Sequence, residues 1–128
     1  MNLYEKKLID HYHNPQNYGS LIEPHFAVQE YNPSCGDCIT IEGHVVNAVI
    51  HELRFTAQGC IISKATASLL LQECIGKPIE FSAALTSEDV LKLITIPLGP
   101  LRLKCALMPL QALHRGIVIY NNQKNRDT

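Results

Sequence analysis

The spacing of apolar residues changes along the chain, from alternation in the first half to helical periodicity in the second. Residues 38–45 alternate, with Ile39, Ile41 and Val45 on one side and polar residues on the other. This pattern predicts a half-buried strand. Residues 26–31 predict a shorter strand before it.

A turn near residues 46–47 separates this strand from a third one. On the third strand, Val49, Leu53 and Phe55 are predicted to share one face. Because the links between the three strands are short, we expect them to pair as an antiparallel meander.

Helical spacing is found on both sides of this sheet segment. The predicted helices cover residues 2–12, 61–74, 87–93 and 101 to about 120. Pro109 lies within the first two turns of the last helix, which leaves a kink or a later start open. Residues 121–128 are polar and predict a disordered tail. The chain is therefore expected to be an α+β protein, a three-stranded antiparallel sheet with helices packed on one face.

Length and composition favour a single domain that spans residues 1–128 and can form a core without disulfides. The formal net charge is −1 and both signs are mixed, so neither nucleic acid nor a membrane surface is expected as a partner. The N-terminus is charged and amphipathic, unlike a secretory signal. We therefore expect a cytoplasmic protein, in which cysteines more often serve as ligands or nucleophiles than as disulfides.

Three distant cysteines are the strongest candidates for chemistry: Cys35, Cys60 and Cys105. Each lies where one predicted element ends and another begins, which is where functional groups tend to collect. With the carboxylate of Asp37, they could form a site of three sulfurs and one oxygen. Such a donor set suits zinc, ferrous iron or an iron–sulfur cluster.

The neighbours of these cysteines support that hypothesis. Gly36 and Gly59 remove side chains next to two of them, so the backbone can approach a metal closely. Arg102 and Lys104 place positive charge beside Cys105 and favour its thiolate. Cys60 and Cys105 are both expected at helix N-termini, where the helix dipole has the same effect.

Several alternatives compete with this interpretation. A single buried cysteine most often only fills space, and Cys74, about 21 Å along the helix from Cys60, fits that role. Residues 35–38 spell C-x-x-C, a possible redox or zinc half-site, but Cys38 opens a strand and is expected to point away from Asp37. The six histidines are scattered, and no signature of a cysteine protease accompanies them.

The motifs together resemble one known family, the U-type iron–sulfur cluster assembly scaffolds, which include the IscU, SufU and NifU N-terminal proteins. The resemblance runs from about residue 3 to about residue 118. It rests on Glu5-Lys6-Lys7-Leu8-Ile9-Asp10-His11-Tyr12 with Asn14-Pro15, on Asn32-Pro33-Ser34-Cys35-Gly36-Asp37, on Phe55 through Gly59-Cys60-Ile61-Ile62-Ser63, and on Lys104-Cys105.

The resemblance implies an α+β fold of the SufE/IscU-like kind, and it also implies partners and a mechanism. A cysteine desulfurase would deliver persulfide sulfur, iron and electron donors would complete a transient 2Fe–2S cluster, and recipient apo-proteins would take it away. By motif position, Cys35, Asp37, Cys60 and Cys105 would be the metal-binding residues, and isolated members often carry zinc at this place. Cys105 is our choice for the sulfur acceptor, because Arg102 and Lys104 adjoin it.

Two departures from the family pattern keep rival functions open. Lys104 stands where IscU-type scaffolds have a histidine, which is similar to the SufU branch of zinc-dependent sulfurtransferases. However, the 44 residues between Cys60 and Cys105 are few for the insertion that SufU-type chains carry. Residues 95–100 lack the Leu-Pro-Pro-Val-Lys stretch that chaperones recognise, so chaperone handling is in doubt. A structural zinc domain is the least favoured hypothesis, since closed structural sites rarely use aspartate.

Overall fold

The computed structural model describes residues 3–33 and 36–126. Its elements are, in chain order, α1 (Leu3–His13), β1 (Phe26–Asn32), β2 (Asp37–Val46), β3 (Val49–Gln58), α2 (Ile61–Cys74), α3 (Ile79–Ala83), α4 (Ser87–Ile94) and α5 (Pro100–Arg126). Within these residues, no helix is both long and apolar enough to cross a lipid bilayer.

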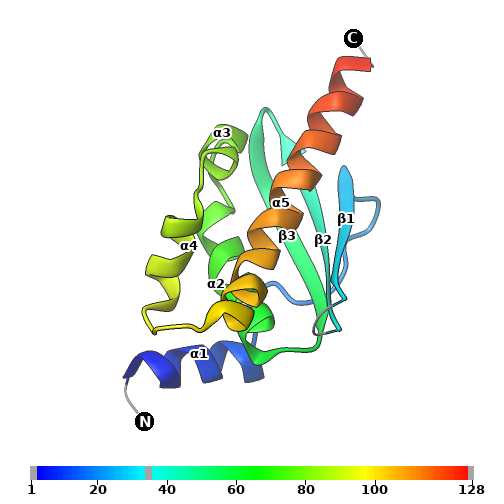
Figure 1. Cartoon of the computed structure of the whole chain (residues 1–128). Coiled ribbons are helices and arrows are strands. Elements are labelled where there is room, and N and C mark those ends of the chain that lie inside the picture. Colours follow the sequence, from blue (N-terminus) through cyan, green and yellow to red (C-terminus); the bar gives the residue numbers. More distant parts are fainter. Residues whose placement is uncertain (1–2, 34–35, 127–128) are drawn as a thin grey trace.

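The strands form an antiparallel sheet of order β1-β2-β3, as the alternating pattern predicts. The long α5 packs on β1 and β2, and α2 packs on β3, so the helices cover one face of the sheet (Figure 1). On β2, every second residue from Asp37 to Val45 is buried against these helices. The predicted α+β fold is confirmed, and the alternation that begins with Asp37 directs its side chain inward.

The third strand differs from the prediction in one place. Ile50, rather than Val49, joins Leu53 and Phe55 in the core, and it is completely buried. The pairing shifts between His44 and Val45 of β2, so that β3 carries one extra residue there. Such a β-bulge changes which side chains face inward on either side of it, and simple alternation cannot follow it.

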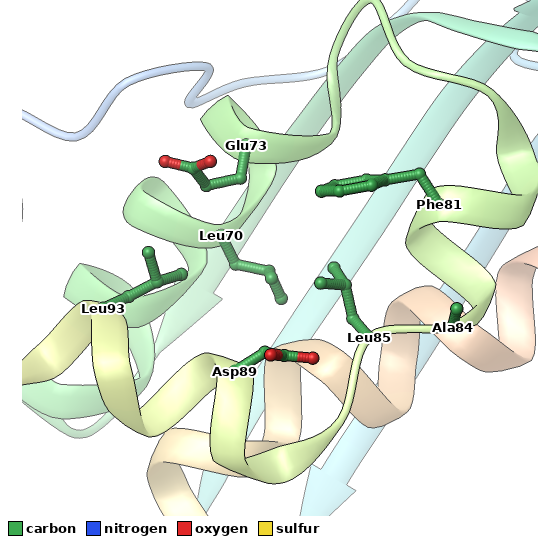
Figure 2. A pocket seen from close by; sticks show the side chains of 7 residues that line it. All are labelled: Leu70, Glu73, Phe81, Ala84, Leu85, Asp89 and Leu93. Atoms are coloured by element: carbon green, nitrogen blue, oxygen red, sulfur yellow. The ribbon is translucent and has the colours of Figure 1, made fainter.

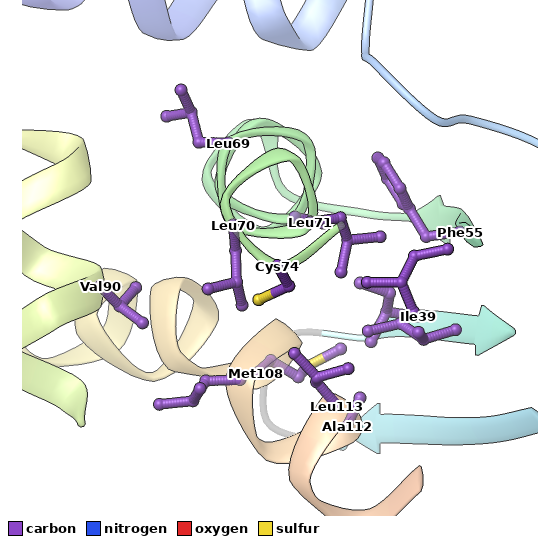
Figure 3. Packing of buried hydrophobic residues seen from close by; sticks show 14 of the residues in the cluster. Ile39, Phe55, Leu69, Leu70, Leu71, Cys74, Val90, Met108, Ala112 and Leu113 are labelled. Atoms are coloured by element: carbon purple, nitrogen blue, oxygen red, sulfur yellow. The ribbon is translucent and has the colours of Figure 1, made fainter. Parts of the chain in front are cut away.

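The core lies around α2, which is buried on most of its circumference. Figure 3 looks along this helix and shows Leu70, Leu71 and Cys74 on the side toward the sheet and α5, while Leu69 points away from them. The predicted bounds of this helix are confirmed. Cys74 is fully buried among these apolar residues, as its predicted space-filling role requires.

The last helix is longer than the pattern predicts. It begins at Pro100, passes through Pro109 and ends at Arg126. Residues 121–126 are thus helical, whereas a disordered tail is predicted there, because the polar sequence gives no helix-stopping signal that would end α5 earlier. Pro109 does not mark a later start. It lacks an N–H, so it cannot donate the usual helical hydrogen bond to the carbonyl four residues earlier.

Candidate metal centre

Three of the predicted ligands converge at one end of the sheet. The Sγ atoms of Cys60 and Cys105 and a carboxylate oxygen of Asp37 all lie within 4.8 Å of one another. Asp37 opens β2, Cys60 lies at the β3–α2 junction, and Cys105 lies on α5. Two sulfurs in a tetrahedral zinc site are about 3.8 Å apart, so small side-chain rotations suffice to place all three around one ion.

Asp37 is 1% exposed, which is unusual for a carboxylate. Its Oδ1 accepts a hydrogen bond of 2.8 Å from the backbone N–H of Cys60. Among the residues that the structure describes, its Oδ2 has no hydrogen-bond partner. A buried carboxylate oxygen without a partner costs free energy, and a bound cation would satisfy it.

Cys60 is the N-cap residue of α2, as the sequence predicts. Its Sγ accepts a hydrogen bond of 3.3 Å from the N–H of Ile62, and its side chain is half-buried. The sulfur therefore lies at the N-terminal end of α2, within reach of a backbone N–H of the first turn.

Cys105 lies in a different local environment from the predicted one. Because α5 begins at Pro100, Cys105 falls in the second turn of the helix rather than at its N-terminus. The dipole effect is concentrated in the first turn, so it contributes little at this position. Cys105 is also 2% exposed, which makes it the less accessible of the two described sulfur ligands.

Cys35, the remaining predicted ligand, lies outside the described residues. Gly36, which follows it, has a φ of +73°. The N–H of Gly36 donates to the carbonyl of Asn32 at 2.8 Å, so the turn is closed by a backbone hydrogen bond. This left-handed conformation explains why glycine is suited to the position directly before the turn enters β2.

The two cationic residues beside Cys105 lie on different sides of α5. Arg102 lines a cavity of about 450 Å³ together with Cys60, Ile61 and Ile96. Lys104 instead lines a hollow of about 300 Å³ next to Pro33 and the end of β1. The sequence predicts both charges at the Cys105 sulfur, whereas in the described part of the chain Arg102 shares a cavity with Cys60 and Lys104 lines a hollow beside β1.

Cys38 and Cys74 do not belong to the centre. Cys38 lies on the outer face of the sheet, where its Sγ accepts a hydrogen bond of 3.2 Å from Nε2 of Gln29. Its predicted orientation away from Asp37 is confirmed, which removes it from the ligand set. Burial in the apolar core raises the pKa of the Cys74 thiol and keeps it protonated.

No described histidine joins the three converging ligands. Nε2 of His114 donates to the carbonyl of Ser82, and His44 contacts the carbonyls of Ile22 and Glu23. His11 contacts the hydroxyl of Ser68 at 2.7 Å and thereby joins α1 to α2. The sequence pattern does not reveal this tertiary contact, because a histidine at a helix end is already explained by the helix dipole.

An apolar groove of about 370 Å³ lies apart from the centre, between α2, α3 and α4. Figure 2 shows Leu70 and Leu85 at its floor and the carboxylates of Glu73 and Asp89 on its sides. Glu73 is paired with Lys77, and Asp89 belongs to the capping box that starts α4. Both carboxylates already have partners, and the lining holds no sulfur or imidazole.

The donor set at the centre fits a soft or borderline metal. Two thiolate sulfurs bind zinc and iron strongly, and one carboxylate oxygen binds them more weakly. The unpartnered oxygen of Asp37 shows that the described residues alone do not satisfy the site. A thiolate-rich centre with one weak oxygen ligand is suited to cargo that must be both bound and released.

Comparison with known proteins identifies the family. A family model described as the NifU-like N terminal domain matches residues 3–127. The chain belongs to this family.

Two curated relatives represent its two functional branches. The iron-sulfur cluster assembly scaffold protein IscU of Aquifex aeolicus is 34% identical, over 96% of this chain and 79% of that protein. The zinc-dependent sulfurtransferase SufU of Bacillus subtilis is 30% identical, over 90% of this chain and 89% of that protein.

Solved structures agree on the fold. The SUF-system protein FiSufU of Fervidobacterium islandicum superposes with a TM-score of 0.78 at 21% identity, over 88% of this chain and 94% of that one. An N-terminal NifU-like protein of Brucella abortus gives a TM-score of 0.77 at 15% identity, over 94% of this chain and 95% of that one. These structures support the α+β architecture.

Proposed function

We propose that this protein is a scaffold on which an iron–sulfur cluster is built and from which it is passed to apo-proteins. The observation that carries the proposal is the convergence of Asp37, Cys60 and Cys105, with one carboxylate oxygen left unpartnered among the described residues. Membership of the NifU-like family and the similarity to an IscU scaffold support it. The protein would act as a carrier and would not turn over a substrate by itself.

The proposed ligands are Cys35, Cys60, Cys105 and Asp37. Cys35 is included because it precedes Asp37 by two residues in the sequence, and Asp37 begins β2 beside the other proposed ligands. Three sulfurs and one oxygen would hold a 2Fe–2S cluster as cargo, or zinc in its place. Sulfur is the preferred ligand of both metals, so Asp37 would be the ligand that is exchanged most easily.

Sulfur would reach the scaffold by exchange from a cysteine desulfurase. The thiolate of Cys105 attacks the outer sulfur of the donor persulfide, a new S–S bond forms at Cys105, and the donor cysteine leaves as a thiolate. This step is redox-neutral, and an electron donor is needed later to reduce the transferred sulfur to sulfide. Cys60 is the competing acceptor, because it is half-buried and lines a cavity, whereas Cys105 is 2% exposed.

A second candidate function is a zinc-dependent sulfurtransferase that works with a desulfurase. It is favoured by Lys104, which replaces the histidine found before the last cysteine of IscU-type scaffolds, and by the similarity to SufU. The same residues would then hold zinc, and the protein would carry sulfur without building a cluster.

Anaerobic reconstitution separates the two functions. Purified protein is incubated with ferrous iron, cysteine, a cysteine desulfurase and a thiol reductant that supplies the electrons, and visible absorbance is recorded. A scaffold develops sulfur-to-iron charge-transfer bands that fade when an apo-ferredoxin is added and becomes loaded. A sulfurtransferase stays colourless and zinc-bound but accelerates the desulfurase.

The matched variants are Cys105→Ser, Cys60→Ser and Cys38→Ser, compared by mass spectrometry for persulfide. Loss of the persulfide only in Cys60→Ser would reassign the acceptor to Cys60. A protein that forms no cluster and does not accelerate the desulfurase has neither function.

A further inference from the structure

We propose that Gly59 is a positioning residue of the metal centre. The space left by its missing side chain lets the carboxylate of Asp37 lie against the β3–α2 junction, with Oδ1 held by the N–H of Cys60 and Oδ2 as the oxygen that binds metal. This inference rests on the proposed metal centre and deepens it, since it names the residue that fixes how aspartate enters the ligand set.

The space around Gly59 is tight toward Asp37. A Cβ at this position would lie 2.9 Å from Cγ of Asp37 and 3.0 Å from its Cα, and it would overlap Oδ1 outright. Neither the Cα nor the buried carboxylate can move away easily, because Asp37 is 1% exposed and begins a paired strand. Any side chain at residue 59 would therefore displace the carboxylate.

Backbone conformation alone does not explain this close approach. Gly59 has a φ of +115°, but Gly19, Gly36 and Gly76 also have positive φ, and a Cβ on any of these three would meet nothing within 4 Å. All four need glycine for their dihedral angles, and only Gly59 also needs it for space. The chain thus contains its own controls for separating backbone strain from displacement of Asp37.

This arrangement predicts that Asp37 binds the metal through one carboxylate oxygen. Oδ1 already accepts a hydrogen bond from the N–H of Cys60, at 2.8 Å, which favours the unpartnered Oδ2 as the metal contact. The same hydrogen bond links two ligands directly, since its donor is the backbone of Cys60 and its acceptor is the side chain of Asp37. Groups that orient metal ligands in this way typically change metal affinity by roughly 10- to 100-fold when altered.

The test compares Gly59→Ala with Gly19→Ala, which carries a similar backbone strain far from the ligands. Zinc affinity is measured by competition with a chromophoric chelator, and the ligand set is followed by the absorbance of bound Co²⁺. We expect Gly59→Ala to weaken zinc binding by roughly 10- to 100-fold. Its Co²⁺ complex should keep the thiolate charge-transfer bands and show altered ligand-field bands, because only the oxygen ligand is displaced. Gly19→Ala should match the wild type in both measurements.

If Gly59→Ala does not fold, the same comparison is made in proteins that also carry Asp37→Ala. With the carboxylate removed, most of the obstruction is gone, so Asp37→Ala/Gly59→Ala should unfold at the same temperature as Asp37→Ala/Gly19→Ala. Equal zinc affinity and equal Co²⁺ spectra for Gly59→Ala and wild type would overturn the inference while leaving the metal centre intact. A double variant that unfolds well below its control would overturn it as well. A wild-type protein that binds neither zinc nor Co²⁺ would instead remove the metal centre itself.

Discussion

Asp37 and Cys38 are neighbours in the sequence, but their side chains lie on opposite faces of β2. Asp37 is buried beside Cys60 and Cys105, whereas Cys38 is paired with Gln29 on the outer face of the sheet. This division follows from strand geometry, which sends successive side chains to opposite sides. The sulfur of Cys38 is therefore directed away from Asp37, Cys60 and Cys105.

Replacing Cys38 tests this division. We expect Cys38→Ser to keep the zinc content of the wild type and to change the free energy of unfolding by less than about 0.5 kcal/mol, since the residue lies at a partly exposed position. Metal content is measured by elemental analysis and stability by urea denaturation. Loss of zinc from Cys38→Ser would place this sulfur in the ligand set.

Removing the carboxylate of Asp37 should raise the stability of the metal-free protein and lower its affinity for zinc. In the metal-free protein, the buried Oδ2 has no partner among the described residues, and we expect the cost of burying it to exceed the gain from the hydrogen bond between Oδ1 and the N–H of Cys60. We expect the metal-free variant to gain about 1 kcal/mol, which corresponds to an unfolding temperature about 4 °C higher. Zinc affinity should fall in the same variant. Calorimetry measures the unfolding temperature, and chelator competition measures the zinc affinity. A variant that is less stable than the wild type and binds zinc with the same affinity would contradict this expectation.

Cys74 should be chemically inert in the folded protein. Burial raises the pKa of its thiol, so little thiolate forms near neutral pH. Mass spectrometry after brief treatment with iodoacetamide should find Cys38 alkylated and Cys74 unmodified. Both should react once the protein is unfolded in urea. Rapid labelling of Cys74 under native conditions would show that the core around α2 opens readily.

His11 should make the stability of the fold depend on pH. Burial, and then the charge of Lys7, lower its pKa below the ordinary value of 6.5, although Asp10 acts in the opposite direction. The unfolded chain therefore binds a proton more readily than the folded one between the lowered pKa and 6.5. Stability should rise with pH across this window and be lost as the pH falls through it.

The measurement is urea denaturation at a series of pH values, with His11→Gln as the variant and the exposed His51→Gln as its control. We expect His11→Gln to flatten the pH dependence and His51→Gln to leave it unchanged. A wild-type protein that becomes more stable on acidification through this range would show that burial does not lower the pKa of His11.

Sequence patterns predicted the sheet, the α2 helix and the location of Cys60 at its N-cap, because each depends on local periodicity and on residues next to one another in the chain. The bulge opposite Val45 was missed, since nothing in the alternation marks the extra residue at His51. The role of Cys105 was only partly predicted. Its sulfur lies beside the other ligands, yet its distance from the start of α5 depends on where that helix begins.

The contribution of Gly59 could not be predicted in full either. The sequence indicates that a glycine next to a cysteine gives backbone freedom, but the contact with Asp37 joins residues from distant parts of the chain. Only the folded chain shows that the missing side chain makes room for a specific carboxylate. Contacts of this kind depend on tertiary packing rather than on local pattern.

X-ray absorption spectroscopy of the zinc-loaded protein tests whether the distant ligands meet at one ion. We expect four ligands, three sulfurs at about 2.3 Å and one oxygen at about 2.0–2.2 Å, with the oxygen contribution lost in Asp37→Ala. A spectrum dominated by imidazole nitrogen, or one that is unchanged in both Cys60→Ser and Cys105→Ser, would show that these residues do not hold the metal.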